Sequence, residues 1–309
     1  MPKPFRFSAQ IQAPVSGREW AEQARKVEDL GYSALTMSDH FGDQLAPLAG
    51  MMAAACATTT LRLATLVHDN DYRHPLILAK EASTIDLLSD GRLELGLGAG
   101  WMRSDYAESG MPYDRPGVRI DRFEEALAVI KGLMADGPFT FAGTHYTITG
   151  HEGTPKPKQR PHPPIVIGGG GKRVLGIAGR EADIVSINPN LKDGTGGAET
   201  APNIVPAMTS QKIEWVREAA GARFAEIELH ALVGFCMFTD DPMSIANAMA
   251  GPFGISAEEA MHVPVLLMGT VDSMVEELQR RREEWGFSYI TVEGPWEEFA
   301  PVVSRLAGT

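Results

Sequence analysis

The chain has 309 residues and a formal net charge of −12. Its residues are 44% hydrophobic and 22% charged, which is the composition of a folded protein. The acidic balance disfavours non-specific binding to nucleic acid or to anionic membranes, because no basic segment offsets it. No stretch approaches the ~20 apolar residues of a membrane span, and the N-terminus lacks an apolar signal core, so a soluble cytoplasmic protein is expected.

Eight strand-like runs alternate with helical stretches over most of the chain. In chain order they are Phe5–Gln10, Ser33–Ser38, Leu61–Val67, Arg92–Ala99, Pro164–Gly168, Ala182–Ile187, Glu228–Phe238 and Ser288–Glu293. This alternation predicts an α/β fold, a (β/α)8 TIM barrel that forms one domain over residues 1–309. Such barrels keep their chemistry at the carboxyl ends of the strands, so functional residues are expected there.

Three segments interrupt the alternation and are interpreted as insertions. Phe139–Ile148 contains two alternating runs around Ala142-Gly143, which predicts a β-hairpin outside the barrel before strand five. Leu191–Asn203 is rich in glycine and poor in hydrophobic residues, which favours a mobile loop after strand six. Asp240–Val263 carries short helical pieces after strand seven.

Asp39 and His40 end the second strand. A carboxylate beside an imidazole can tune its proton affinity. Adjacent strand residues point to opposite sides, so one of the two is expected to face the barrel mouth while the other anchors a loop. A helix-capping aspartate with a fully bonded histidine is the structural alternative, and the local sequence favours neither interpretation.

Four potential metal ligands, His68, Asp69, Asp71 and His74, follow the third strand. They resemble the ligand clusters of barrel hydrolases, which bind divalent metals. Those hydrolases usually draw further ligands from later strands, whereas strands four to six end here in Gly-Ala-Gly-Trp, Gly-Gly-Gly-Gly and Ser-Ile-Asn. No metal site is therefore predicted.

Two glycine-rich turns join a strand to a helix, Gly96–Trp101 after strand four and Ile167–Arg173 after strand five. Glycine lets the backbone approach a ligand closely, and amides at a helix N-terminus attract phosphate. Lys172 and Arg173 add positive charge to the second turn. Together the turns predict a phosphate-bearing ligand, although neither matches a Rossmann fingerprint. Trp101 could pack on a planar ring or roof the barrel.

In combination these motifs resemble the luciferase-like monooxygenase superfamily, whose members are (β/α)8 barrels that bind flavin or deazaflavin. The motifs that carry the resemblance are Ser38–Phe41, Arg73–Pro75, Leu87–Trp101, Pro163–Gly170, Gly179–Asp183, Leu267–Thr270 and Gly286–Thr291. Asp39-His40 further resembles the branch that uses the deazaflavin coenzyme F420, in which this pair lies beside the reactive ring.

The resemblance implies an oxidoreductase that transfers a hydride between F420 and a small organic substrate, with His40 as proton donor or acceptor and Asp39 helping to set its state. It also implies a non-proline cis peptide bond beneath the ring at Thr65–Leu66, phosphate contacts near Gly100, Gly169 and Gly170, and a homodimer. The cofactor-binding residues expected from it are Thr65, Leu66, His68, Ala99, Gly100, Trp101, Gly168, Gly169, Gly170 and Gly171.

One departure from the family pattern bears on the substrate. Sugar-phosphate dehydrogenases of the F420 branch carry a catalytic glutamate directly after the glycine of the strand-four motif, and Trp101 stands in that place. This argues against glucose 6-phosphate. Two alternatives stay open: an FMN-dependent monooxygenase, in which reduced flavin reacts with oxygen, and a non-catalytic flavin-binding barrel. The sequence separates F420 from FMN only through Asp39-His40.

Overall fold

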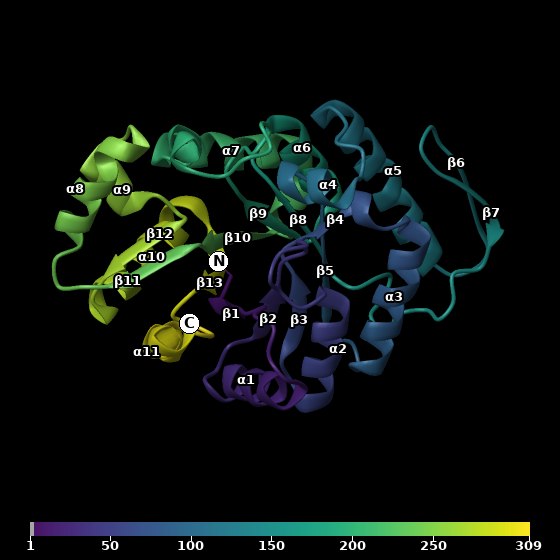
Figure 1. Cartoon of the computed structure of the whole chain (residues 1–309), viewed down its shortest axis with the longest axis horizontal. Coiled ribbons are helices and arrows are strands. Elements are labelled where there is room, and N and C mark those ends of the chain that lie inside the picture. The colour runs from purple at the N-terminus through teal and green to yellow at the C-terminus, as the bar shows by residue number, and fades with distance from the viewer. Residues whose placement is uncertain (1–2) are drawn as a thin grey trace.

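A computed structural model describes residues 3–309, and its strands close into a parallel barrel (Figure 1). The barrel strands are β1 (Arg6–Gln10), β2 (Ala34–Met37), β3 (Arg62–Thr65) with β4 (His68–Asp69), β5 (Leu93–Gly98), β8 (Ile165–Gly169), β9 (Ile184–Ile187), β10 (Glu228–Val233) and β13 (Phe287–Glu293). Pairing of β3 with β5 and of β1 with β13 completes the ring, and β4 continues the β3 position along β5. The predicted (β/α)8 barrel is confirmed.

Helices cover the outside of this ring. They are α1 (Gly17–Asp29), α2 (Pro47–Ala57), α3 (Pro75–Leu88), α5 (Pro116–Met134), α6 (Lys172–Glu181), α7 (Pro206–Ala220), α10 (Val271–Trp285) and α11 (Trp296–Leu306), whereas the short helix α4 (Arg103–Ser109) lies at the mouth of the barrel. Local sequence starts several of them: Ser16 and Glu19 form a capping box at α1, and proline opens α2, α3, α5 and α7. Trp20, Ala24 and Val27 show the resulting buried face. Within residues 3–309, no helix combines the length and apolarity needed to cross a bilayer.

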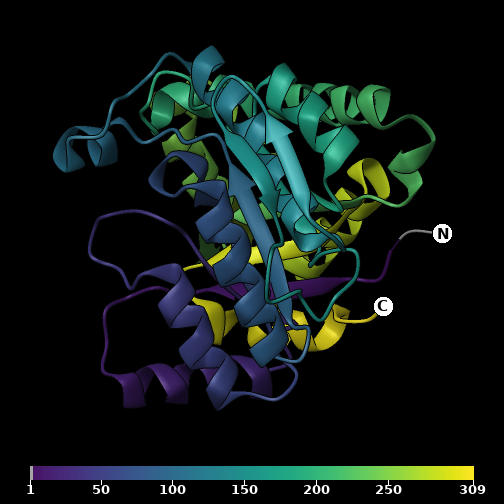
Figure 2. The same ribbon diagram turned by 90° about the vertical axis from the view of Figure 1, so that its right-hand side faces the viewer.

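The two ends of the described chain meet beside the first strand (Figure 2). The amide of Phe5 donates to the carbonyl of Thr309 at 3.2 Å, and the amide of Gly308 donates back to Phe5 at 2.8 Å. These bonds tie the segment after α11 to the start of β1. They therefore reinforce the closure of the barrel between its first and last strands.

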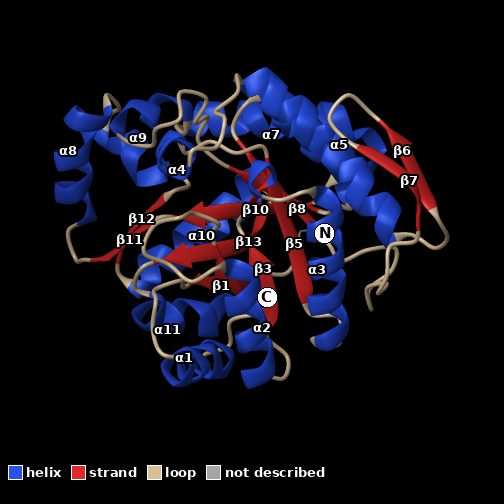
Figure 3. Ribbon diagram, turned by 45° about the vertical axis from the view of Figure 1, so that its right-hand side comes forward, coloured by secondary structure: helices blue, strands red, loops and turns tan. Residues whose placement is uncertain are grey.

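The predicted hairpin is confirmed as β6 (Phe139–Ala142) and β7 (Thr147–His151), which project away from the barrel beside α5 (Figure 3). Its turn is longer than Ala142-Gly143 suggested, because the amide of Gly143 bonds to the carbonyl of Tyr146. The carboxylate of Glu125 on α5 accepts three consecutive amides of this turn, at 2.7, 2.8 and 3.1 Å. A helix side chain thus anchors the hairpin tip.

The seventh strand was predicted as one run over Glu228–Phe238, and the structure differs. It divides at Gly234 into β10, which stays in the barrel, and β11 (Phe235–Phe238), which pairs with β12 (Leu266–Gly269) in a separate two-stranded sheet. The sequence analysis did not predict β12. The intervening helices α8 (Pro242–Phe253) and α9 (Ala257–His262) bury a small core of their own against it, so packing of the insertion draws the strand out of the barrel.

Alternate residues of β1 and β13 point into the barrel and form polar levels. At the lower level the Arg6 guanidinium lies 3.6 Å from the centre of the Tyr289 ring and pairs with Glu94 at 2.6 Å. At the next level the hydroxyls of Ser8 and Thr291 are 2.5 Å apart. Both pairs are register partners, so Gln10 and Glu293, the third pair, lie at the mouth.

Candidate active site

His40 lies at the barrel mouth beside a carboxylate that the sequence analysis did not select. Its Nδ1 is 2.7 Å from Oδ2 of Asp105 on α4, and the hydroxyl of Tyr72 donates to the same oxygen at 2.9 Å. The imidazole meets the Trp101 ring edge to face, with the ring centres 5.7 Å apart. A quarter of the His40 side chain is exposed (25%). Asp105 therefore orients the ring through Nδ1, and Nε2 has no hydrogen-bond partner within residues 3–309.

Asp39 has a different role from its neighbour. It is buried, and its carboxylate accepts hydrogen bonds from Arg73 and from Nδ1 of His68, the latter at 3.1 Å. Burial alone raises the pKa of Asp39, but the hydrogen bonds and charges of His68 and Arg73 outweigh it and lower that pKa to about 2. The structure thus separates the pair as strand alternation predicted: His40 faces the mouth and Asp39 anchors neighbouring segments.

A second acidic group supports the wall of the mouth. The hydroxyl of Tyr106 donates to both oxygens of Asp69, at 3.1 and 3.0 Å, and also contacts Asp71, which Arg122 holds from α5 at 2.7 Å. Burial raises the pKa of Asp69 to about 7, with the nearby charge of Asp71 adding to the rise. These residues stiffen the segment after β4 on which the site is built.

The suggested metal ligands are committed to other partners. His68 bonds Asp39, Asp71 pairs with Arg122, and His74 accepts the amide of Leu76 as the cap of α3. Across residues 3–309, no group of three or more histidine, cysteine or acidic side chains is arranged to hold a metal ion. The geometry of this region is that of a hydrogen-bonded support.

The first glycine turn is required by packing. Gly100 has φ of +75°, and a Cβ there would lie 2.0 Å from the hydroxyl oxygen of Tyr106. Arg119, a buried residue of α5, donates to the carbonyls of Ala99 and Gly100 at 3.3 and 3.2 Å. Arg119 was missed by the sequence analysis, although it shares the apolar face of its helix with Phe123. It holds the carbonyls inward and so sets the shape of the turn.

The second glycine turn ends at a helix N-terminus without a side-chain cap. Gly171 is the N-cap of α6, and this residue provides no side-chain hydrogen bond to cap the helix. A Cβ on Gly170 would lie 2.2 Å from the carbonyl oxygen of Pro189, so the next loop also demands glycine here. Arg173 turns away to Asp121 of α5. The open amides, more than the basic side chains, therefore fit a phosphate group.

The cis peptide bond lies one position later than expected, at Leu66–Val67 instead of Thr65–Leu66. Thr65 is still in the ladder with Met37, and its hydroxyl bonds the amide and carbonyl of Gly96 at 3.0 and 3.1 Å. Its side chain is therefore buried between β3 and β5, away from the mouth. The amide of Leu66 still donates to the carbonyl of Met37 at 2.8 Å, and the cis bond follows directly after it.

Val67, which the sequence analysis did not select, forms part of the floor of the mouth. A Cβ on Gly98 would lie 2.7 Å from its side chain, and one on Gly168 would lie 3.4 Å from it. Leu66 packs against the buried cluster of Ala34, Val166, Ile184 and Tyr289. Glycine at two strand ends thus makes room for the Val67 side chain, and at Gly168 also for the amide of Asn188.

The loop after β9 lies against the turn that carries Trp101. The amide of Arg103 donates to the carbonyl of Gly194 at 3.1 Å, and a Cβ on Gly196 would lie 3.6 Å from the Trp101 ring. Lys212, buried on α7, donates to the carbonyls of Asn188 and Asn203 at 2.7 and 2.6 Å. Burial lowers the pKa of Lys212 to about 8. This lysine joins the two ends of the loop.

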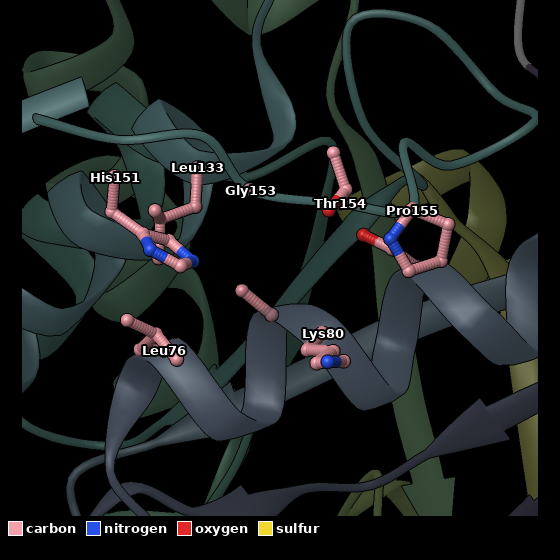
Figure 4. A pocket seen from close by; sticks show the side chains of 9 residues that line it. Leu76, Lys80, Leu133, His151, Gly153, Thr154 and Pro155 are labelled. Atoms are coloured by element: carbon pink, nitrogen blue, oxygen red, sulfur yellow. The ribbon is translucent and has the colours of Figure 1, made fainter. Parts of the chain in front are cut away.

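A hollow on the outside of the barrel is unrelated to these residues. It lies between α3 and the segment after β7, with Leu76 and Lys80 on one side and His151 and Thr154 on the other (Figure 4). None of the strand-end residues lines it. The chemistry expected of a barrel belongs to the mouth, where His40 and the two glycine turns lie.

Comparison with known proteins shows the family of the chain. The chain matches the family model of luciferase-like monooxygenases over residues 3–241. It is 32% identical to the FMNH2-dependent dimethylsulfone monooxygenase of Pseudomonas putida over 120 residues, which are 39% of this chain and 33% of that protein. The match therefore spans about a third of that relative's length.

Two further similarities involve F420. The F420-dependent glucose-6-phosphate dehydrogenase of Amycolatopsis mediterranei is 28% identical over 235 residues, which are 69% of this chain and 69% of that protein. The coenzyme F420-dependent tetrahydromethanopterin reductase of Methanopyrus kandleri has a TM-score of 0.79 at 18% identity and covers 98% of both chains. At that identity the second similarity shows the fold alone. FMNH2 and F420 thus both occur among proteins similar to this chain.

Proposed function

This chain belongs to the luciferase-like monooxygenase family, and we propose that it is an oxidoreductase that transfers a hydride between coenzyme F420 and a small organic substrate. The observation that carries the proposal is His40 at the mouth, held through Nδ1 by Asp105. A proton-carrying side chain there suits hydride transfer, because oxidation of an alcohol or reduction of a carbonyl also moves a proton. The F420-dependent relative supports this choice of cofactor.

Several residues have the chemistry to hold the cofactor. The uncapped amides of α6 after Gly171 suit its phosphate, and the floor formed by Val67, Gly98 and Gly168 suits a flat ring. Nε2 of His68 is buried with no hydrogen-bond partner in the described chain, which fits a polar group arriving from a ligand. F420, when bound, supplies or accepts the hydride.

The protein's own part in the reaction is to position and to move the proton. Nε2 of His40 would exchange the proton with the substrate oxygen, while Asp105 and Tyr72 keep the imidazole in one orientation. Asp39 acts through its neighbours, because it fixes Arg73 and His68 beside the site. Trp101 covers the His40 edge and limits the size of the substrate.

An FMN-dependent monooxygenase is the second candidate. The dimethylsulfone monooxygenase, 32% identical over 120 residues, favours it. A non-catalytic flavin-binding barrel would bind cofactor without turnover. The cofactor decides the reaction type, because the deazaflavin ring lacks the nitrogen that favours reaction with oxygen.

Titration of the purified protein with F420 and with FMN, followed by the fluorescence of each, tests the proposal. We expect saturable F420 binding at least tenfold tighter than FMN binding. Mass spectrometry of ligand released from the protein gives an independent measurement. Tight FMN binding without measurable F420 binding would contradict the proposal and favour the monooxygenase.

A homodimer is proposed for the assembly. Helices α2 and α3 lie side by side (Figure 1), and α3 presents Ile77, Leu87 and Leu88 to solvent at 51%, 47% and 64% exposure. Exposed apolar groups of this kind mark contact surfaces. Light scattering is expected to give twice the chain mass of 33.4 kDa, and Ile77→Glu with Leu88→Glu is expected to give the monomer. A monomeric wild-type protein would contradict this.

A further inference from the structure

The uppermost polar level of the barrel carries two side chains with acceptor oxygens that have no hydrogen-bond partner among residues 3–309. Gln10 and Glu293 are register partners at the carboxyl ends of β1 and β13. Below them, Ser8 with Thr291 and Arg6 with Tyr289 are in mutual contact inside the barrel. Because side chains alternate along a strand, Gln10 and Glu293 point the same way, into the mouth.

Gln10 is almost fully buried, with 8% of its surface exposed. Its Oε1 is buried and has no hydrogen-bond partner among residues 3–309. A buried polar atom without a partner destabilises a fold, and native proteins therefore keep few of them. An amide in this state at the mouth of an enzyme barrel is suited to a bond with a ligand.

Glu293 is half-buried, and no hydrogen bond or ion pair to its carboxylate is found in the described chain. The other acidic side chains of the mouth, Asp39, Asp69 and Asp105, are all bonded to tyrosine, histidine or arginine. Burial raises the pKa of Glu293, and the charge of His40 opposes that rise. Glu293 is thus an unpaired acid within the electrostatic reach of His40.

The level has two chemically different halves. Around the ring, β5 and β8 stand opposite β1 and β13. On the β5 and β8 half, Val67 fills the space that Gly98 leaves, and the Asn188 amide and Val67 lie beside Gly168. The β1 and β13 half carries Gln10 and Glu293, and β2, the strand before His40, adjoins β1. A flat cofactor ring suits the first half, which leaves the second for the substrate.

We propose that Glu293, with Gln10, binds the substrate beside His40 and selects molecules whose bound part carries O–H or N–H donors and no negative charge. The substrate class is therefore a small alcohol, amine or ammonium compound. The role in the reaction rests on the proposed function. An unpaired carboxylate attracts a donor or a cation and repels phosphate, sulfonate or carboxylate. The carboxylate of Glu293 would thus disfavour a sugar phosphate as substrate on electrostatic grounds, in addition to the argument from Trp101.

Isothermal titration calorimetry with three probes on one ring tests this selectivity: cyclohexylamine, cyclohexanol and cyclohexanecarboxylate. We expect the wild-type protein to bind the amine and the alcohol at least tenfold more tightly than the carboxylate. Glu293→Gln keeps the size of the side chain and removes its charge. This variant is expected to weaken binding of the amine at least tenfold, to weaken binding of the alcohol less, and to strengthen binding of the carboxylate.

Glu297→Gln is the matched control, since Glu297 is an exposed acid of α11 that pairs with Lys26. It removes the same charge away from the mouth and should leave all three affinities unchanged. Gln10→Leu should weaken binding of the alcohol. Equal binding of the amine and the carboxylate, an unaltered preference in Glu293→Gln, or no binding of either donor probe would overturn the proposal.

The titrations need no cofactor, so they are independent of the proposed reaction. F420 affinity should be the same in wild type and Glu293→Gln, because the residue is assigned to the substrate half. Failure of F420 to bind the wild-type protein would contradict the proposed function. The substrate selectivity proposed for Glu293 would then be tested by the probe titrations alone. An F420 affinity that falls together with amine affinity in Glu293→Gln would overturn the assignment of Glu293 to the substrate.

Discussion

Replacing His40 by alanine is expected to lower kcat by a factor of about 10² to 10⁴, the range that a positioned acid or base contributes. The reason is that Nε2 of His40 is the atom proposed to carry the proton, since Asp105 occupies Nδ1 at 2.7 Å. Cofactor binding should change little, because the glycine turns and Val67 are untouched. Single-turnover measurements with F420 and titration of the cofactor separate the two effects.

A graded set of variants sharpens this test. Asp105→Asn should lower kcat less than His40→Ala does, because the imidazole itself is kept. It should still lower kcat, because asparagine can donate as well as accept and so no longer sets one tautomer of the imidazole. Added imidazole should restore part of the activity of His40→Ala. His151→Ala removes a histidine from the exposed hairpin and should be neutral. Unchanged turnover in His40→Ala would remove His40 from the mechanism.

Replacing Gly96 by alanine is expected to lower the free energy of unfolding by more than ~3 kcal/mol, because overpacking against backbone cannot be relieved by a side-chain rotation. The added Cβ would lie 1.8 Å from the carbonyl oxygen of Thr65. It would also push apart the Thr65 hydroxyl and the Gly96 amide, which are 3.0 Å apart. β3 and β5 meet here to close the barrel, so urea denaturation should show a large loss of stability.

Gly117→Ala is the matched control for this prediction. Gly117 lies in the first turn of α5, and a Cβ there would meet nothing within 4 Å. Alanine is the better helix former, so this variant should be stabilised by up to ~1 kcal/mol. If Gly96→Ala unfolded at the same urea concentration as Gly117→Ala, the close approach of β3 and β5 would not be needed for barrel closure.

The barrel could be predicted because its signals are local. Each strand and helix has its own periodicity, its own caps and its own turn residues, as the capping box at Ser16 and Glu19 illustrates. The one large error, Glu228–Phe238 as a single strand, arose where the choice was not local. Both halves of that run are good strands, and only packing against β12 decides that the second half leaves the barrel.

The candidate site was predicted in part for the same reason. His40, Trp101 and the glycine turns lie at strand ends, which can be read from the sequence. Asp105 could not be selected, because it is 65 positions from His40 and meets it only across the mouth. The expected cis bond was misplaced by one residue, since its place depends on where β3 leaves its ladder with β2.

By itself, therefore, the sequence determined the architecture, the edge of the barrel that bears chemistry, and the resemblance to flavin-binding enzymes, because periodicity and turn chemistry act within a few residues. Only the tertiary structure decided which side chains meet at that edge. Barrel closure and strand register bring Asp105 to His40, place Val67 over Gly98 and Gly168, and set Gln10 beside Glu293 from the two ends of the chain. Those contacts join residues far apart in sequence, and no local pattern specifies them.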